Sequence, residues 1–211
     1  MFVVFLLALL VVSGAASPIE ASCNANTLRK CFATYLNQFH LNSQPSIPDY
    51  VEYATARAFY LDQKAVPGQK DVCGWQHDLE GCLGADLAAC MTAPAFEGAM
   101  GVSQTEAVEY QTDFFVQRYQ CGAGYQTLID NFYCLHTTRR DEIDEFRACD
   151  RQLHNNIDSG FKCSYYNTYI NCDRAIYTNS CGQGVSKFVC ESKKASIQAS
   201  THSCDSTLLK C

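Results

Sequence analysis

Fourteen cysteines constrain the fold of this chain more than any other feature of its sequence. All of them follow an apolar leader, and their number is even. Disulfides persist in oxidising compartments and are rare in the cytosol. The sequence therefore predicts an exported protein in which every cysteine pairs: Cys23, Cys31, Cys73, Cys82, Cys90, Cys121, Cys134, Cys149, Cys163, Cys172, Cys181, Cys190, Cys204 and Cys211.

The leader has the form of a secretory signal peptide. Residues 2–12 are apolar throughout, a run too short to span a bilayer, which takes about 20 residues. Small residues follow at 13–17, so we expect cleavage after Ala16. The alternative is that the run forms a buried N-terminal helix. The preferred interpretation is a signal peptide over residues 1–16 and one cysteine-rich domain over residues 17–211, secreted to the extracellular space.

The charge balance makes nucleic acid and anionic membranes poor candidates as partners. The formal net charge is −6, and adjacent basic residues occur only as isolated pairs, such as Arg139–Arg140 and Lys193–Lys194. Binding to a phosphate backbone needs clustered Lys and Arg, so no nucleic-acid partner is expected. No second apolar run has the length of a membrane span. The expected partner is an unidentified extracellular protein or glycan.

Apolar residues recur at helical spacing along almost the whole chain. One stripe with the i, i+3, i+4, i+7 pattern consists of Leu28, Cys31, Phe32, Tyr35, Leu36 and Phe39. Similar stripes follow Trp75, Ala107, Tyr125 and Ile143, and no convincing alternation of period two occurs. We therefore predict an all-α fold, a disulfide-stapled bundle of about six to eight helices with no sheet.

Several residue types mark where these helices begin. A helix over 48–63 has proline in its first turn, where the missing N–H is harmless. Ser103 and Glu106 have the spacing of a capping box. Asp141 and Glu142 are expected to open a further helix, because negative charge is favourable at the positive end of the helix dipole.

Four cysteines, at 163, 172, 181 and 190, are spaced nine residues apart. On one continuous helix, successive members would face opposite sides. Gly182 and Gly184 instead favour a break and a helical hairpin. In a hairpin, cysteines on one arm can reach those on the other.

The best linker candidate is residues 92–102, which are small and contain Pro and Gly. Five cysteines precede this segment and nine follow it. Because both numbers are odd, complete pairing requires at least one disulfide that crosses it. Such a disulfide would join the two sides into one covalent unit.

The most enzyme-like motif is His77-Asp78, between Cys73 and Cys82. A His–Asp pair on a disulfide-anchored helix resembles the active-site helix of secreted phospholipases A2. In that family the histidine activates water and the aspartate holds calcium. Here the cysteine spacing differs and no glycine-rich calcium loop precedes the motif. The preferred interpretation is an exposed pair on an amphipathic helix.

No other cluster predicts catalysis or a bound cofactor. The cysteines and histidines lack the close spacing of zinc ligands, and Ser103 is not in a G-x-S-x-G motif. Four carboxylates between residues 141 and 145 are more typical of a solvated helix face. Ser159, followed by Gly160, is the one Ser-Gly after the leader that could accept a glycosaminoglycan, although a turn explains it equally well. No catalytic residue, metal or cofactor is expected.

The second half of the chain resembles a family of nematode secreted proteins. The resemblance rests on Tyr119-Gln-Cys121-Gly, Phe132-Tyr-Cys134-Leu, Cys149, Cys163, Tyr169-Ile-Asn-Cys172 and Cys181-Gly-Gln-Gly184. It covers about residues 73–204 and points to the chondroitin proteoglycan 4 domain family, related to nematode domain of unknown function 19. That resemblance implies an extracellular helical domain without known catalysis, in some members a proteoglycan core protein. Clustered acidic Ser-Gly sites are missing from this chain.

Two functions from different classes follow. The first is a secreted, non-catalytic structural or interaction module, with a proteoglycan core as its more specific form. The second is a secreted lipid-active protein, either a helical lipid carrier or a phospholipase A2-like hydrolase using His77 and Asp78. A filled core favours the module, a large apolar cavity favours the carrier, and convergence of His77 and Asp78 on one open site favours the hydrolase.

Overall fold

The computed structural model describes residues 22–43 and 46–211, and every regular element in these ranges is helical. The all-α prediction is therefore confirmed, with no strand in the described residues. The predicted signal peptide, residues 1–16, lies outside them. Within the described ranges, no helix combines the length and apolar content needed to cross a bilayer.

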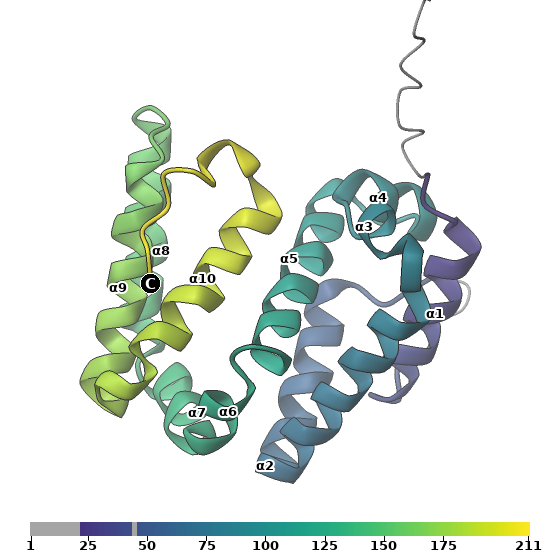
Figure 1. Ribbon diagram of the computed structural model, residues 1–211, viewed down its shortest axis with the longest axis horizontal. Helices are drawn as coiled ribbons and strands as arrows, with labels where there is room; N and C mark the ends of the chain where they lie inside the picture. The colour runs from purple at the N-terminus through teal and green to yellow at the C-terminus, as the bar shows by residue number, and fades with distance from the viewer. Residues whose placement is uncertain (1–21, 44–45) are drawn as a thin grey trace, which may run out of the picture.

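The helices form two halves that meet along α5 and α10, which lie side by side in the centre of Figure 1. The N-terminal half, up to Cys121, contains α1 (Ala25–Asn37), α2 (Tyr50–Leu83), α3 (Leu87–Cys90), α4 (Ala93–Met100) and α5 (Gln104–Cys121). The C-terminal half, from Gly122, contains α6 (Tyr125–Asp130), α7 (Phe132–Asp141), α8 (Ile143–Asp158), α9 (Ser164–Cys181) and α10 (Ser186–Ser200). Short 3-10 turns lie at Gly84–Asp86, Gln183–Val185 and His202–Cys204.

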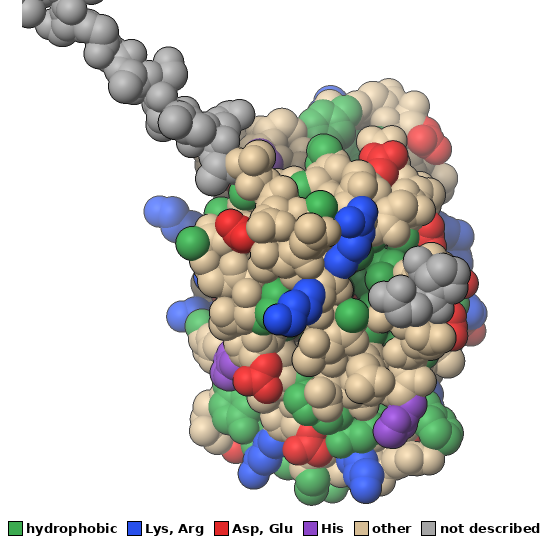
Figure 2. Space-filling view, turned by 90° about the vertical axis from the view of Figure 1, so that its right-hand side faces the viewer, with side chains coloured by type: hydrophobic (Ala, Val, Ile, Leu, Met, Phe, Trp, Pro, Cys, Tyr) green, Lys and Arg blue, Asp and Glu red, His purple; other side chains and the backbone are tan. Residues whose placement is uncertain are grey.

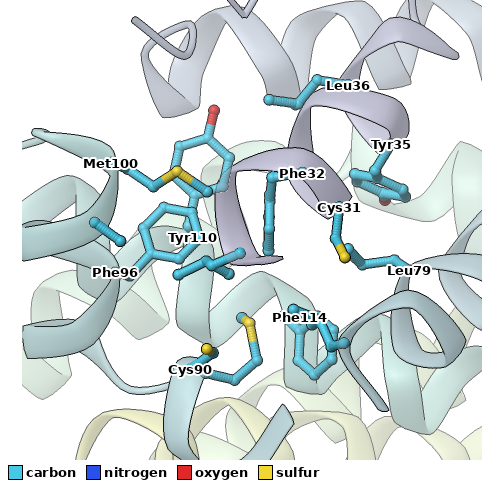
Figure 3. Packing of buried hydrophobic residues seen from close by; sticks show 14 of the residues in the cluster. Cys31, Phe32, Tyr35, Leu36, Leu79, Cys90, Phe96, Met100, Tyr110 and Phe114 are labelled. Carbon is cyan, nitrogen blue, oxygen red and sulfur yellow. The ribbon is translucent and has the colours of Figure 1, made fainter. Parts of the chain in front are cut away.

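An aromatic core fills the N-terminal half. Phe32 lies at its centre, with Phe96 and Tyr110 beside it (Figure 3). The Phe32 and Phe96 ring centroids are 4.8 Å apart at a steep angle, and Phe96 stacks on Tyr110 at 5.1 Å. Edge-to-face and offset-stacked pairs of this kind are favoured by the ring quadrupoles. The whole stripe predicted from Leu28 to Phe39 is buried here.

Seven disulfides link the helices, and no free cysteine remains. The pairs are Cys23–Cys90, Cys31–Cys82, Cys73–Cys121, Cys134–Cys181, Cys149–Cys172, Cys163–Cys204 and Cys190–Cys211. The complete pairing expected from the even count is thus present. Cys73–Cys121 alone joins the first five cysteines to the last nine, as the odd split required.

The predicted linker over 92–102 is wrong, because most of it forms α4. The Thr92 hydroxyl accepts a hydrogen bond from the Ala95 N–H and caps the helix, and proline lies in the first turn, where it is tolerated. Phe96 is completely buried, so core packing stabilises the segment. Gly101, with φ of 71°, ends it in a left-handed conformation suited to glycine.

The hairpin predicted at Gly182 is correct, but the expected pairing between its arms is wrong. Gly182 has φ of 81° and separates α9 from α10. The four cysteines spaced nine apart instead pair outward, to Cys204, Cys149, Cys134 and Cys211. The spacing puts successive cysteines on opposite sides of α9, so each meets whichever element covers that side.

Two helix starts also differ from prediction. Pro48 precedes the cap of α2, which is Asp49, and so lies just outside the first turn. Asp141 ends α7, and the acidic residues in the first turn of α8 are Asp144 and Glu145. The capping box of α5 is confirmed, with the Ser103 hydroxyl and the Glu106 carboxylate each accepting the other residue's backbone N–H.

Candidate functional site

His77 and Asp78, the predicted enzyme-like pair, do not converge. Both side chains are exposed on α2. His77 Nε2 lies 3.2 Å from the carbonyl oxygen of Cys121 at the end of α5. Asp78 instead lines a small cavity of about 50 Å³ against α1. Adjacent residues on a helix point about 100° apart, and each of these meets a different neighbouring helix.

Ser159, the predicted glycosaminoglycan acceptor, lies on the surface. It caps the C-terminus of α8, and its hydroxyl donates to the carbonyl oxygen of Asn156 at 2.7 Å. Both Ser159 and Gly160 are exposed. The described residues contain no group of three or more His, Cys, Asp or Glu side chains that could hold a metal ion.

A cavity of about 500 Å³ lies between the two halves. We call it the interhalf cleft. One wall comes from α2 and α5, and the other from α6, α7, α9 and α10. Its size is that of small-molecule sites, which run to roughly 300–1,000 Å³. The lining residues are Tyr50, Arg57, Leu61, Gln69, Thr112, Asp113, Val116, Gln117, Gln120, Leu128, Phe132, Leu135, His136, Arg139, Asp173, Tyr177, Phe188, Val189, Ser192, Lys193 and Ser196.

On the N-terminal wall, a buried ion pair is fully satisfied. Arg57 Nη1 and Nη2 donate to the two oxygens of Asp113 at 2.5 and 2.6 Å. Tyr53 also donates to Asp113, at 3.1 Å, and its hydroxyl lies 2.8 Å from that of Tyr35. Burial raises the pKa of Tyr53 well above its usual value, although Arg57 opposes the shift. Two-pronged Arg–carboxylate pairing with additional donors is what a buried charge needs to be tolerated.

On the C-terminal wall, a second buried carboxylate is only half satisfied. Asp173 is 2% exposed, and its Oδ2 is 2.6 Å from Lys193 Nζ. Lys193 also donates to the Tyr169 hydroxyl at 2.8 Å, and that hydroxyl donates to Asp150 at 2.7 Å. Asp173 Oδ1 has no hydrogen-bond partner. Burial raises the pKa of Asp173 despite the opposing effect of the Lys193 ammonium.

Unpaired polar atoms concentrate at this cleft. Within the described part of the chain, three buried side-chain oxygens have no hydrogen-bond partner: Gln117 Oε1, Asp173 Oδ1 and Ser192 Oγ. All three residues line the interhalf cleft, and they come from α5, α9 and α10. A buried polar atom without a partner costs roughly 1–3 kcal/mol, so most native structures avoid it. Three around a single cavity therefore mark it as the candidate site.

The rest of the lining combines apolar side chains with uncharged polar ones and with charged groups, among them Arg139, whose guanidinium lies 4.7 Å over the Phe146 ring. Phe132 stacks on His136 at a centroid distance of 5.5 Å, and His136 Nε2 is 2.6 Å from Asp62 Oδ1 on α2. Burial raises the pKa of Tyr177 to about 12, so its hydroxyl is neutral at ordinary pH. Such an arrangement can hold a molecule by apolar contact and orient it by a few hydrogen bonds.

Sequence reasoning missed this site, although the signal was present. Ala107, Tyr110 and Phe114 form a buried stripe, and Gln117 occupies its next position. Asp173 likewise follows the buried Ile170 by three residues on α9. A polar residue at a stripe position is predicted to be buried and therefore to need a partner. Its partners belong to other helices and are not visible in the local pattern.

Comparison with known proteins adds no relative: no family model, curated protein or solved structure matches this chain. The resemblance to the chondroitin proteoglycan 4 domain family stays a prediction. On the face shown in Figure 2, Lys and Arg side chains lie scattered among acidic and uncharged groups. That face therefore presents no broad basic area of the kind that binds nucleic acid.

Proposed function

We propose that this protein is a secreted, non-catalytic extracellular interaction module that receives its partner in the interhalf cleft. The observation that carries the proposal is the cleft itself, a cavity of about 500 Å³ where three unpaired buried polar atoms gather. Seven disulfides fit an extracellular protein, because such bonds persist in oxidising surroundings. The leader supports secretion.

Two observations favour the module over the lipid-active alternative. Within the described residues, Leu28, Leu36 and Phe96 of the N-terminal core are completely buried, and the cavities of about 50 and 10 Å³ against this core are too small for a lipid chain. The interhalf cleft carries ion pairs on both walls, whereas a site for long hydrocarbon chains is expected to be apolar throughout. The separate directions of His77 and Asp78 also favour a non-catalytic role.

The experiment is a ligand screen by NMR with a blocked cleft as its control. Ser196 lines the cleft from α10 and is half-buried, so Ser196→Trp would fill part of the cavity. We expect a panel of small fragments to include some that bind the wild type and are released by this substitution. Circular dichroism of the variant checks that the helices are retained. Binding that is identical in both proteins for every fragment would refute the cleft as the binding site.

A proteoglycan core is the more specific form of the proposal. Ser159 is exposed at the end of α8, where a glycosyltransferase can reach it. Secreted wild-type protein would then lose mass on chondroitinase treatment, and Ser159→Ala would not. An unchanged wild-type mass would remove the proteoglycan role and leave the interaction module standing.

A further inference from the structure

Resting on the proposed function, we infer that the interhalf cleft binds a neutral molecule that carries hydroxyl groups beside an apolar flank. The inference starts from the chemistry of the unpaired atoms. An ionised Asp173 only accepts hydrogen bonds, Gln117 Oε1 is also an acceptor, and Ser192 can do either. The missing partner must therefore bring hydrogen-bond donors.

The ligand's charge follows from the ion pairs already present. Arg57 is paired with Asp113, and Lys193 is paired with Asp173. An anion at Arg57 or Lys193 would have to displace a carboxylate and would meet unpaired acceptors instead of donors, and Arg139, which also lines the cleft, has its guanidinium over the Phe146 ring at 4.7 Å. A cation at Asp173 Oδ1 would lie beside the Lys193 ammonium and be repelled by it. A neutral hydroxyl satisfies Asp173 Oδ1 while both ion pairs stay intact.

The apolar flank follows from the remaining walls. Leu61 and Val116 line the N-terminal side, and Leu128, Phe132 and Val189 line the C-terminal side. Burial of apolar surface against such side chains contributes roughly 25 cal/mol per Å². Hydroxyl groups on a hydrocarbon or sugar ring combine this contact with the required donors.

The three acceptors lie just behind the cleft surface, shielded from solvent. A bound hydroxyl group therefore reaches them only when these side chains move from the positions that the structure shows.

The test compares molecules that differ only in their donors. The probes are octane-1,2-diol and methyl β-glucopyranoside, the first standing for a glyceride head group and the second for a glycan end. The control is 1,2-dimethoxyoctane, which keeps the tail and both oxygens of the diol but has no donor. We expect at least one probe to bind about tenfold or more tightly than the dimethyl ether, since two hydrogen bonds are lost. The preferred probe identifies the source of the ligand.

Ser192→Ala separates a binding role from a structural one. Because the hydroxyl has no partner in the fold, its removal should leave the thermal midpoint unchanged or higher, yet weaken probe binding by about three- to tenfold. Ser206→Ala, a matched change at an exposed serine outside the cleft, should alter neither. A lower midpoint with unchanged binding in Ser192→Ala would overturn the inference.

The two proposals fail in different ways. If the dimethyl ether binds as tightly as the diol and glucoside, and Ser196→Trp abolishes its binding, the cleft is a binding site but donors do not select the ligand. If no probe or fragment responds to Ser196→Trp, the proposed function fails as well. Tight glucoside binding that is lost in both Ser192→Ala and Ser196→Trp supports both proposals, whereas tight diol binding lost in both supports the inferred ligand chemistry and favours the lipid-carrier alternative for the function.

Discussion

Each half of the molecule is stabilised by a different means. The N-terminal half has a continuous core around Phe32, Phe96 and Tyr110, and three of the seven disulfides lie wholly within it. The C-terminal half contains four disulfides, and its buried apolar residues form two smaller clusters, one around Leu128 and Phe188 and the other around Ile170 and Ile197. In the C-terminal half, disulfides thus supply stability that a larger apolar core would otherwise supply.

This difference also explains where the candidate site lies. In the half with the aromatic core, the buried carboxylate of Asp113 has several partners, and the unpaired Gln117 Oε1 belongs to a residue that lines the cleft. The C-terminal half tolerates an unpaired oxygen at Asp173. Disulfides hold the helices in place without requiring every gap between them to be filled. One wall of the interhalf cleft belongs to the half with the packed aromatic core, and the other belongs to the half that contains four disulfides.

The largest effect is expected from reduction of all disulfides. Each of the four bridges within the C-terminal half stabilises by about 3–4 kcal/mol in the chain-entropy model, for sequence separations of 21 to 47. After reduction and alkylation, amides in α8 to α10 should exchange rapidly with solvent, and those in α1 and α5 should stay more protected. Hydrogen exchange with mass spectrometry measures both. Equal loss of protection in the two halves would contradict the comparison.

The Cys73–Cys121 bridge joins α2 to the end of α5 and is the one bridge between the first five cysteines and the last nine, so its removal should have a defined all-or-none consequence. Cyanogen bromide cuts after Met91 and Met100, between the two cysteines. On a denaturing gel without reductant, the large wild-type fragments should stay joined, and those of Cys73→Ser/Cys121→Ser should separate. Losing this bridge, with a separation of 48 residues, should also cost about 4 kcal/mol of unfolding free energy.

Either result on the gel would be decisive. Wild-type fragments that separate without reductant would show that no bridge crosses the α3–α5 region. Joined fragments in the double variant would reveal a second crossing bridge. Addition of reductant, which should separate the fragments of both proteins, provides the control.

The sequence predicted the helical class, the buried stripes and the existence of a crossing bridge, because each depends on local spacing or parity. The stripe from Leu28 to Phe39 lies in the core as expected. Disulfide pairing was not predictable, since it depends on which helices become neighbours. Residues 92–102 were misassigned because their Pro and Gly content suggests a loop, whereas the burial of Phe96 favours a helix.

The cleft escaped prediction for a related reason. Gln117 and Asp173 are separated by more than fifty residues, and only the packing of α5, α9 and α10 brings both to one cavity. The capping box at Ser103 was predictable because its partners lie three residues apart. Local signals therefore identify helix ends well, and polar residues within apolar stripes point to sites whose partners lie elsewhere in the sequence.

The two buried carboxylates permit a matched substitution. Asp113→Asn leaves Arg57 buried without its counter-charge and should cost about 3–5 kcal/mol of unfolding free energy. Asp173→Asn should cost less, because Lys193 is 25% exposed and can turn toward solvent. Urea denaturation at pH 7 measures both. A larger loss of unfolding free energy for Asp173→Asn than for Asp113→Asn would contradict the contrast between the fully hydrogen-bonded Asp113 and the partly hydrogen-bonded Asp173.

Asp173 also gives a testable dependence of stability on pH. Because burial raises the pKa of Asp173 in the folded state above its ordinary value of 3.8, the folded protein binds that proton more tightly than the unfolded chain does. The stability contributed by the protonated form is fully present below 3.8 and is lost as pH rises through the folded pKa. Asp173→Asn should remove this part of the pH dependence. An identical profile in the variant would contradict the raised pKa.

The smallest effect is expected at His77, where the end of α5 meets α2. Its side chain is exposed and forms one hydrogen bond, to the Cys121 carbonyl oxygen at 3.2 Å, so His77→Ala should cost less than about 1 kcal/mol. His154→Ala, at an exposed histidine on α8, provides the matched control. With phospholipid vesicles and calcium, neither the wild type nor either variant should release fatty acid. Release by the wild type that disappears in His77→Ala and persists in His154→Ala would establish the hydrolase alternative, because only His77 belongs to the motif that resembles the phospholipase helix.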